Sequence, residues 1–266
     1  MSVYLAFARS AVLTQLAYRN EVWANMFGKL VQVFARVAIW LAIYATASAE
    51  SIGDVTLIQM VTYALLGGVI VGAIRYEAII STIGHALKTG DVAVWLLKPV
   101  SFPLYVIASE LGRAAYRLIV LVVPTVIVVA LIYGMLPPAS LFDGAMFVAY
   151  LLLGYTIVCL ISALFGLVSF WLLTSFSLEW LMQAFLNLLS GSLIPFWFFP
   201  EPFGTICAHL PFAWIVYYPA AIWLGRLPPM ESLLYFGVGL GWAALLALGM
   251  AWLWRRASTR VIVQGG

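Results

Sequence analysis

The chain has 266 residues and a formal net charge of +3, and hydrophobic residues make up 65% of it against 9% charged residues. Soluble domains contain about 45–50% apolar and about 25% charged residues. Together with a mean hydropathy of +1.08, this composition excludes an ordinary water-soluble fold, a disordered chain and a nucleic-acid-binding protein. The two cysteines, Cys159 and Cys207, are too few for a disulfide framework and lack metal-site spacing. The composition therefore predicts an integral membrane protein.

The first twenty residues predict a helix that lies at the membrane surface. Arg9 and Arg19 flank a moderately apolar stretch, and no small-residue cleavage site follows an apolar core of the kind that signal peptides have. We therefore expect residues 1–20 to form an interfacial helix ahead of the first span.

Six apolar segments follow, each long enough to cross the hydrocarbon as a helix, which takes about 20 residues. They cover residues 30–48, 57–74, 104–133, 145–173, 180–198 and 232–254. Their apolar runs are continuous rather than alternating, which favours helices over a β-barrel. Pro124 is expected to kink the third segment. The sequence thus predicts an all-α integral membrane protein with one transmembrane domain, residues 1–266.

Basic residues collect on one side of this six-span arrangement. All lysines and arginines except Arg226 fall on the side of the two termini, whereas the opposite side carries acidic residues: Glu50, Asp54, Asp143, Glu201 and Glu231. Cytoplasmic loops of membrane proteins are enriched in lysine and arginine. We therefore expect a multi-pass protein of the cell (inner) membrane with both termini in the cytoplasm.

The stretch 199–231 is apolar and aromatic, but four prolines interrupt it: Pro200, Pro202, Pro211 and Pro219. A seventh span here would also place the C-terminal arginines outside. We expect short helices that dip back into the outer leaflet as a re-entrant hairpin, which is tolerated where protein buries the backbone. A hydrophobic surface loop is the alternative.

Motifs of nucleotide hydrolysis and metal catalysis are absent from the sequence. It contains no Gly-x-x-x-x-Gly-Lys-Ser/Thr, His-Glu-x-x-His, Cys-x-x-Cys or Gly-x-Ser-x-Gly. The chain is therefore not expected to be an enzyme, and we expect no metal or cofactor of its own.

The predicted cytoplasmic loop 75–100 mixes charge with apolar residues at helical spacing. Ile79, Ile83 and Leu87 fall on one face, and Gly90-Asp91 is expected to break the helix. Such an amphipathic helix would suit docking to a soluble partner. A helix that rests on the lipid surface is the alternative.

This layout resembles the membrane subunit of ATP-binding-cassette exporters of the type 2 permease family, over almost the whole chain. Lys88-Thr89-Gly90-Asp91 leading to Leu96-Leu97-Lys98-Pro99-Val100 is similar to a segment of its bacterial members. Their outer hairpin is similar to the following pieces of this chain: Gly191-Ser192-Leu193-Ile194-Pro195, Phe199-Pro200, Leu210-Pro211-Phe212, Tyr218-Pro219 and Gly225.

The resemblance implies a transport machine of several subunits. Two permeases, identical or homologous, would form the path for an amphipathic or hydrophobic substrate, and two copies of a separate ATPase would bind ATP and magnesium. Coupling would pass through the N-terminal helix and loop 75–100, whose expected contact residues are Glu77, Ile83, His85, Lys88, Asp91 and Trp95. A secondary transporter, which would show matched repeats, and a non-transport membrane scaffold are the alternatives.

A polar stripe runs along the fifth apolar segment. Its members recur at i, i+4, i+8 and i+11: Glu179, Gln183, Asn187 and Ser190. Because polar groups are costly in lipid, the stripe should face protein or water. We interpret it as lining the substrate path; hydrogen bonding between helices is the alternative.

A second set of polar residues consists of charges expected to enter the membrane: Arg36, Glu110, Arg113 and Arg117. A charge at that depth needs a partner or a side chain that reaches back to water. We expect Glu110 to pair with Arg113 within its helix, and with Arg36 or Arg117 across helices. The alternative is that all four lie at the inner interface and reach water.

Overall fold

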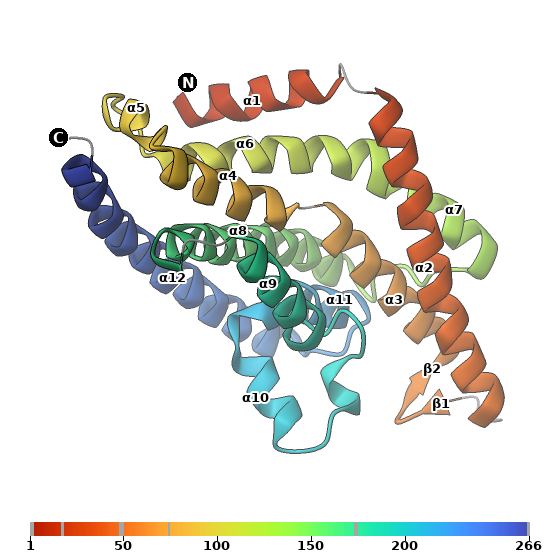
Figure 1. The fold of residues 1–266 in the computed structure, drawn as a ribbon. Helices are drawn as coiled ribbons and strands as arrows, with labels where there is room; N and C mark the ends of the chain where they lie inside the picture. Colours follow the sequence, from red (N-terminus) through yellow and green to blue (C-terminus); the bar gives the residue numbers. More distant parts are fainter. Residues whose placement is uncertain (1–2, 17–18, 48–50, 74, 173–174, 265–266) are drawn as a thin grey trace.

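The computed structural model describes residues 3–16, 19–47, 51–73, 75–172 and 175–264 of the chain (Figure 1). This part is almost entirely helical, as the sequence predicts. Its strands are β1 (Ser51–Ile52) and β2 (Val55–Thr56), which pair antiparallel in a short hairpin. Gly53 and Asp54 turn this hairpin, both with positive φ angles.

The helices follow one another with short connections. In chain order they are α1 (Val3–Leu16), α2 (Arg19–Ala47), α3 (Leu57–Ala73), α4 (Tyr76–Thr89), α5 (Val92–Leu96), α6 (Phe102–Arg117), the π-helix η1 (Leu118–Val122), α7 (Val123–Tyr133), α8 (Leu141–Leu172), α9 (Phe176–Leu189), the 3₁₀ helix η2 (Phe196–Phe198), α10 (Phe203–His209), the 3₁₀ helix η3 (Pro211–Trp214), α11 (Tyr217–Trp223) and α12 (Pro229–Gln264).

Four helical segments of the described chain are long and apolar enough to cross a membrane: Leu57–Ala86, Phe102–Tyr133, Leu141–Leu172 and Pro229–Thr259. They contain or closely match the predicted spans 57–74, 104–133, 145–173 and 232–254. The predicted span 30–48 falls on a shorter apolar helix, Leu30–Thr46. A total of six spans therefore stays a prediction.

The predicted span 180–198 is wrong as a continuous helix. α9 ends at Leu189, and Gly191 then takes a φ of +76°. A side chain at Gly191 would meet the Tyr63 hydroxyl at 2.9 Å, so the turn needs glycine. Residues 190–198 continue instead as bends and the 3₁₀ helix η2.

The kink expected at Pro124 is present. Directly before this proline the helix widens into the π-helical turn η1, and α7 runs on from α6 at an angle (Figure 1). Proline lacks an amide hydrogen and crowds the preceding turn, which is a common cause of such a break.

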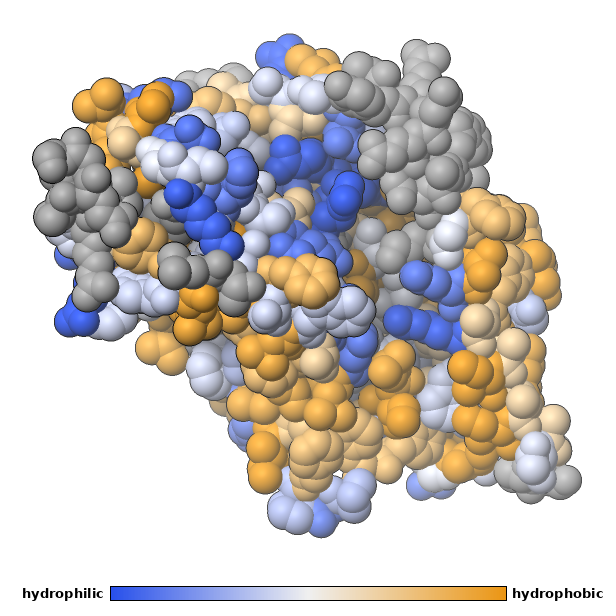
Figure 2. Space-filling view, in the orientation of Figure 1, coloured by the Kyte–Doolittle hydropathy of each residue, from blue (hydrophilic) through white to orange (hydrophobic). Residues whose placement is uncertain are grey.

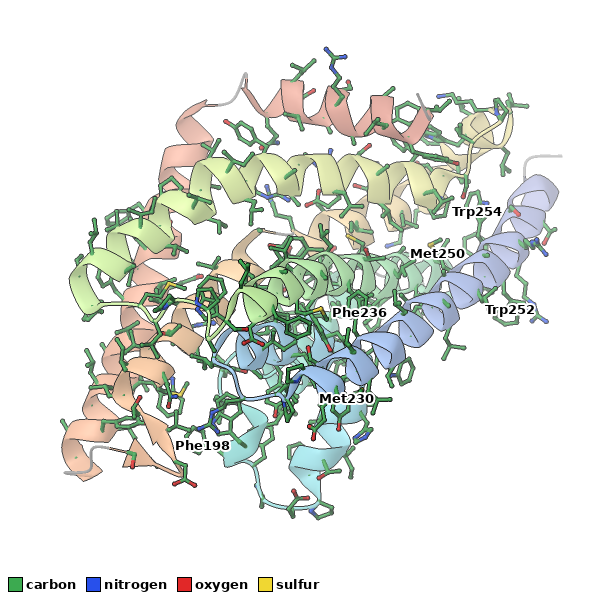
Figure 3. All side chains as sticks on the ribbon, turned by 180° about the vertical axis from the view of Figure 1, so that it is seen from behind. Phe198, Met230, Phe236, Met250, Trp252 and Trp254 are labelled. Carbon is green, nitrogen blue, oxygen red and sulfur yellow. The ribbon has the colours of Figure 1, made fainter. Side chains whose placement is uncertain are left out.

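The core is built around α8, which packs against α4, α11 and α12. Two glycines of α8 allow close approach: a Cβ at Gly154 would lie 2.4 Å from the Trp214 carbonyl oxygen, and one at Gly166 would lie 2.9 Å from Ile83. α12 covers α8 with one face only. Met250 of that helix is buried, whereas Met230 and Trp252 point away from the bundle (Figure 3).

The stretch 199–231 forms short helices, as expected. Residues 211–216 and 218–222 are buried, and the Trp214 indole donates to the Tyr235 carbonyl oxygen at 2.9 Å. This burial excludes a surface loop for that part. Entry of the segment into the outer leaflet stays a prediction.

The N-terminal helix α1 lies along α6 (Figure 1). Their backbones approach so closely that a Cβ at Gly112 would lie 2.2 Å from the Ala8 carbonyl oxygen. Its placement at the membrane surface stays a prediction. The start of α1, α5 and the C-terminal part of α12 lie at one end of the molecule, opposite the β1–β2 hairpin and α10 (Figure 1).

Candidate functional site: a polar cavity between α2, α3 and α9

A cavity of about 650 Å³ opens between α2, α3, the start of α4, the α6–η1–α7 helix and α9. Figure 2 shows hydrophilic atoms in the hollow of this face, between largely apolar surfaces. Apolar residues such as Val33, Leu121 and Leu193 form part of the wall. Polar and charged side chains form the rest: Gln32, Arg36, Arg75, Tyr76, Glu77, Arg117, Thr125, Gln183 and Asn187.

Of the four residues of the predicted polar stripe on α9, two line the cavity and two do not. Gln183 and Asn187 line the cavity, and the Gln183 side-chain nitrogen donates to the Asn187 side-chain oxygen at 3.0 Å. The Tyr76 hydroxyl in turn donates to the Gln183 side-chain oxygen. The amides are thus oriented by a neighbouring helix while they face the cavity. Their role in a substrate path stays a prediction.

Ser190 does not line the cavity. It is buried, and its hydroxyl donates to the Leu186 carbonyl oxygen and accepts from the Ser192 amide at 3.2 Å. These hydrogen bonds close the end of α9, so Ser190 has a structural place beside the Gly191 turn.

Glu179 lies outside the cavity wall, before the predicted span 180–198. Partial burial and the nearby Glu77 carboxylate raise the pKa of its carboxyl. Glu77 itself lines the cavity. Acidic groups therefore gather at the N-terminal ends of α4 and α9.

The membrane charges form a cluster around Glu110, whose side chain is 0% exposed. Its carboxylate accepts from the Arg113 Nε at 2.9 Å and from Arg117. The predicted pairing with Arg113 is confirmed. The pairing with Arg117 is also present, but Arg117 reaches Glu110 along the same continuous helix rather than from another one.

Burial excludes the alternative in which every charge reaches water. The Glu110 and Arg117 side chains are 0% and 8% exposed, whereas that of Arg113 is 30% exposed. A buried carboxylate of this kind is stable only when its partners supply several hydrogen bonds.

Glu110 and Arg117 also join the ends of α3 and α4. The Arg117 Nε donates to the Ala73 carbonyl oxygen at 2.7 Å, and the Arg75 amide donates to the Glu110 carboxylate at 3.1 Å. Helix ends leave backbone groups without intrahelical partners. The ion pair satisfies one backbone group at the end of α3 and one at the start of α4, and so fixes α4 relative to α3.

Arg36 lies apart from this cluster, and its predicted pairing with Glu110 is wrong. Its guanidinium is half-buried in the cavity wall and donates to the Ser192 carbonyl oxygen at 3.2 Å. Because α2 packs on α3 and not on α6, Arg36 faces the end of α9 instead of the Glu110 cluster.

Sequence reasoning missed Gln32, Tyr76 and Thr125 as cavity residues. Gln32 stands four residues before Arg36, so both lie on one face of α2. This i, i+4 spacing on an apolar helix is the same signal that identified α9. Tyr76 and Thr125 have no comparable sequence signal.

The loop 75–100 has the predicted form: α4, a break at Gly90 with a φ of +80°, and then α5. Its apolar face is buried within the chain, because Ile79 and Ile83 are 0% exposed and α4 packs on α8. The apolar side chains of α4 therefore contact the rest of this chain, and neither a soluble partner nor lipid is needed to cover them.

The expected coupling residues therefore separate into buried and exposed groups. Direct contact of Ile83 with another subunit is excluded by its burial, and Glu77 faces the cavity. His85, Lys88 and Asp91 are exposed. Trp95 packs against Tyr105, with the Lys98 ammonium 3.8 Å from its ring centre.

Residues 92–97, which we call the α5 tip, expose two apolar side chains that were not among the expected coupling residues. Val94 is 57% exposed and Leu97 is 88% exposed. Nothing in the described part of the chain covers them.

Comparison with known proteins identifies the family of this chain. A family model described as ABC-2 family transporter protein matches residues 30–265. No curated protein and no solved structure matches the chain. The match includes the cavity-lining helices, the loop with α4 and α5, and α12, and it confirms the resemblance found in the sequence. The chain therefore belongs to the ABC-2 family of membrane transporter proteins.

Proposed function

We propose that this chain is the membrane-spanning permease of an ATP-driven exporter. It pairs with a second permease, identical or homologous, and two copies of a separate ATPase hydrolyse ATP with magnesium beneath them. The cavity between α2, α3 and α9 forms this chain's share of the path for an amphipathic or hydrophobic substrate.

The observation that carries this proposal is the position of α4. Tyr76 and Glu77 at its first turn line the cavity, and its last residue, Thr89, stands next to the Gly90 turn and the α5 tip. A helix of 14 residues spans about 21 Å at 1.5 Å per residue. One rigid element therefore connects an exposed surface to the polar cavity.

Packing allows α4 to move only together with its neighbours. Ile83 fits against Gly166 of α8, and a Cβ at Gly84 would meet the Ser169 hydroxyl at 2.6 Å. The Glu110–Arg117 pair holds the junction with α3. A push at the α5 tip is therefore transmitted to the cavity wall rather than absorbed by a flexible loop.

The α5 tip supplies the contact with the ATPase in this proposal. Val94 and Leu97 offer apolar anchors, and exposed His85, Lys88 and Asp91 lie on the same α4–α5 segment. Interfaces commonly take this form, with apolar side chains at the centre and polar groups around them.

Purification of the tagged chain from its native membranes tests the proposal. We expect a soluble ATPase to co-purify and to give magnesium-dependent ATP hydrolysis. The double variant Val94→Asp and Leu97→Asp should lower the co-purified ATPase at least about tenfold, because charge at an apolar anchor typically costs more than 1.4 kcal/mol.

Leu141→Asp is the matched control, since Leu141 is 92% exposed and lies on the predicted outer side. It should retain the ATPase. Uphill transport by the chain alone in sealed vesicles would contradict the proposal and favour a secondary transporter.

A further inference from the structure

We infer that the cavity binds an acidic amphiphile, a molecule with a phosphate or carboxylate group on an apolar chain, and that Arg36 is the side chain that receives the acidic group. This inference rests on the proposed function, because it names the class of substrate for the same cavity. It is carried by the surroundings of Arg36.

Arg36 holds a charge within the predicted span 30–48, where an unpaired arginine is energetically costly. Its guanidinium donates a hydrogen bond to the Ser192 carbonyl oxygen, which is a neutral acceptor. In the part of the chain that the structure describes, no carboxylate pairs with it. A guanidinium has five N–H donors, so most of its capacity is available to a ligand in the cavity.

The acidic residues at the N-terminal ends of α4 and α9, of which Glu77 lines the cavity, lie away from Arg36. Glu77 and Glu179 stand at the first turns of α4 and α9, while Ser192 follows the other end of α9. The eleven residues from Glu179 to Ser190 correspond to about 16 Å of helix. The Glu110 carboxylate is already bound by Arg113 and Arg117. The Arg36 end of the cavity therefore favours an anion.

A second copy of this chain offers no free carboxylate at this depth. Of the ten acidic residues, Glu110 alone falls inside a predicted span, and the others lie in loops or at helix ends: Glu21, Glu50, Asp54, Glu77, Asp91, Asp143, Glu179, Glu201 and Glu231. Pairing with an identical permease therefore leaves Arg36 without a charged partner. In this inference the ligand supplies the negative charge.

Apolar side chains beside Arg36 receive the rest of the ligand. Val33 stands one turn before it on α2, and Leu193 follows the Ser192 that Arg36 contacts. Leu121 and Val122 line the same cavity from η1. The cavity also holds Arg75 and Arg117, but Arg117 is already paired with Glu110. The Arg36 guanidinium next to apolar side chains favours an alkyl chain that ends in an acid over a small hydrophilic anion.

Equilibrium binding of radiolabelled dodecyl phosphate to the full chain, purified in a neutral maltoside detergent with whatever subunits accompany it, tests the inference. We expect saturable binding that Arg36→Gln weakens at least about tenfold and Arg36→Lys weakens less. Arg9→Gln, on the exposed face of α1, should bind as the unmodified chain does.

A second variant leaves Arg36 in place. Asn187→Asp adds a carboxylate to the cavity wall with almost no change in volume, and should also weaken binding about tenfold. Size-exclusion profiles without ligand establish that each variant is folded.

The inference would be overturned by no saturable binding of dodecyl phosphate, by equal binding to folded Arg36→Gln, or by equal competition from dodecyl phosphocholine. Inorganic phosphate that binds as tightly as dodecyl phosphate would also overturn it, because the ligand would then be a free anion. The assay uses neither ATP nor an ATPase. Failure here leaves the permease proposal intact, and absence of a co-purifying ATPase leaves the binding result intact.

Discussion

At the scale of single residues, the Glu110 carboxylate is fully buried and is held by three donors. Arg113, Arg117 and the Arg75 amide all donate to it. Removal of one partner from a buried ion pair usually costs about 3–5 kcal/mol, because a buried charge is left uncompensated. The cluster therefore holds the α3–α4 junction as well as neutralising charge.

We expect Glu110→Gln to lower the stability of the protein by about 3–5 kcal/mol, because the buried Arg117 loses its counter-charge. Thermal unfolding in detergent measures this change, and ATP hydrolysis by the purified complex should fall with it as the α3–α4 junction loosens. Arg113→Gln is the control, with an expected loss below about 1 kcal/mol because Arg113 is partly exposed. Unchanged unfolding and transport in Glu110→Gln would show that the pairing contributes nothing.

At the scale of elements, the contact between α1 and α6 depends on a missing side chain. Gly112 lies where the two backbones meet, and a Cβ there would overlap the Ala8 carbonyl oxygen. Gly237 of α12 has nothing within 4 Å of the same position. Substitution of Gly112 therefore tests the packing of α1 on α6, whereas the same substitution at Gly237 tests only the helix propensity of the residue.

Gly112→Ala should destabilise the protein by about 1–3 kcal/mol, because the added methyl group forces α1 away from α6. Gly237→Ala should be neutral or stabilising by up to about 1 kcal/mol, since alanine favours a helix interior. Thermal unfolding of both variants, with limited proteolysis of the N-terminal segment, measures the difference. A Gly112→Ala protein as stable as Gly237→Ala would show that α1 does not depend on this contact.

At the scale of the whole molecule, the two ends differ in charge as the sequence predicts. α5 and the C-terminal part of α12 lie at one end with basic residues such as Lys98 and Arg256, and Asp54 and Glu201 lie at the other (Figure 1). By the positive-inside rule we expect the first end to face the cytoplasm.

Cysteine labelling in intact cells tests this orientation. Cys159 and Cys207 are fully buried, so an introduced exposed cysteine should react first. We expect Glu201→Cys to react with a membrane-impermeant maleimide in intact cells, and Lys98→Cys to react only after permeabilisation. Reaction of both variants in intact cells would contradict the orientation.

The sequence alone determined the membrane class, the helical fold, most helix positions, the break at Gly90 and the pairing of Glu110 with Arg113. These features are readable because hydrocarbon forces each backbone polar group to be satisfied within its own helix, and because neighbours at i+3 and i+4 share a face. Only the tertiary structure decided that Arg36 faces Ser192, that Tyr76 holds Gln183, that Ile83 is buried on α8 and that α9 ends at Leu189, before the Gly191 turn. Most of these contacts join residues far apart in the chain, and in a uniformly apolar sequence no periodicity distinguishes a face that meets protein from one that meets lipid.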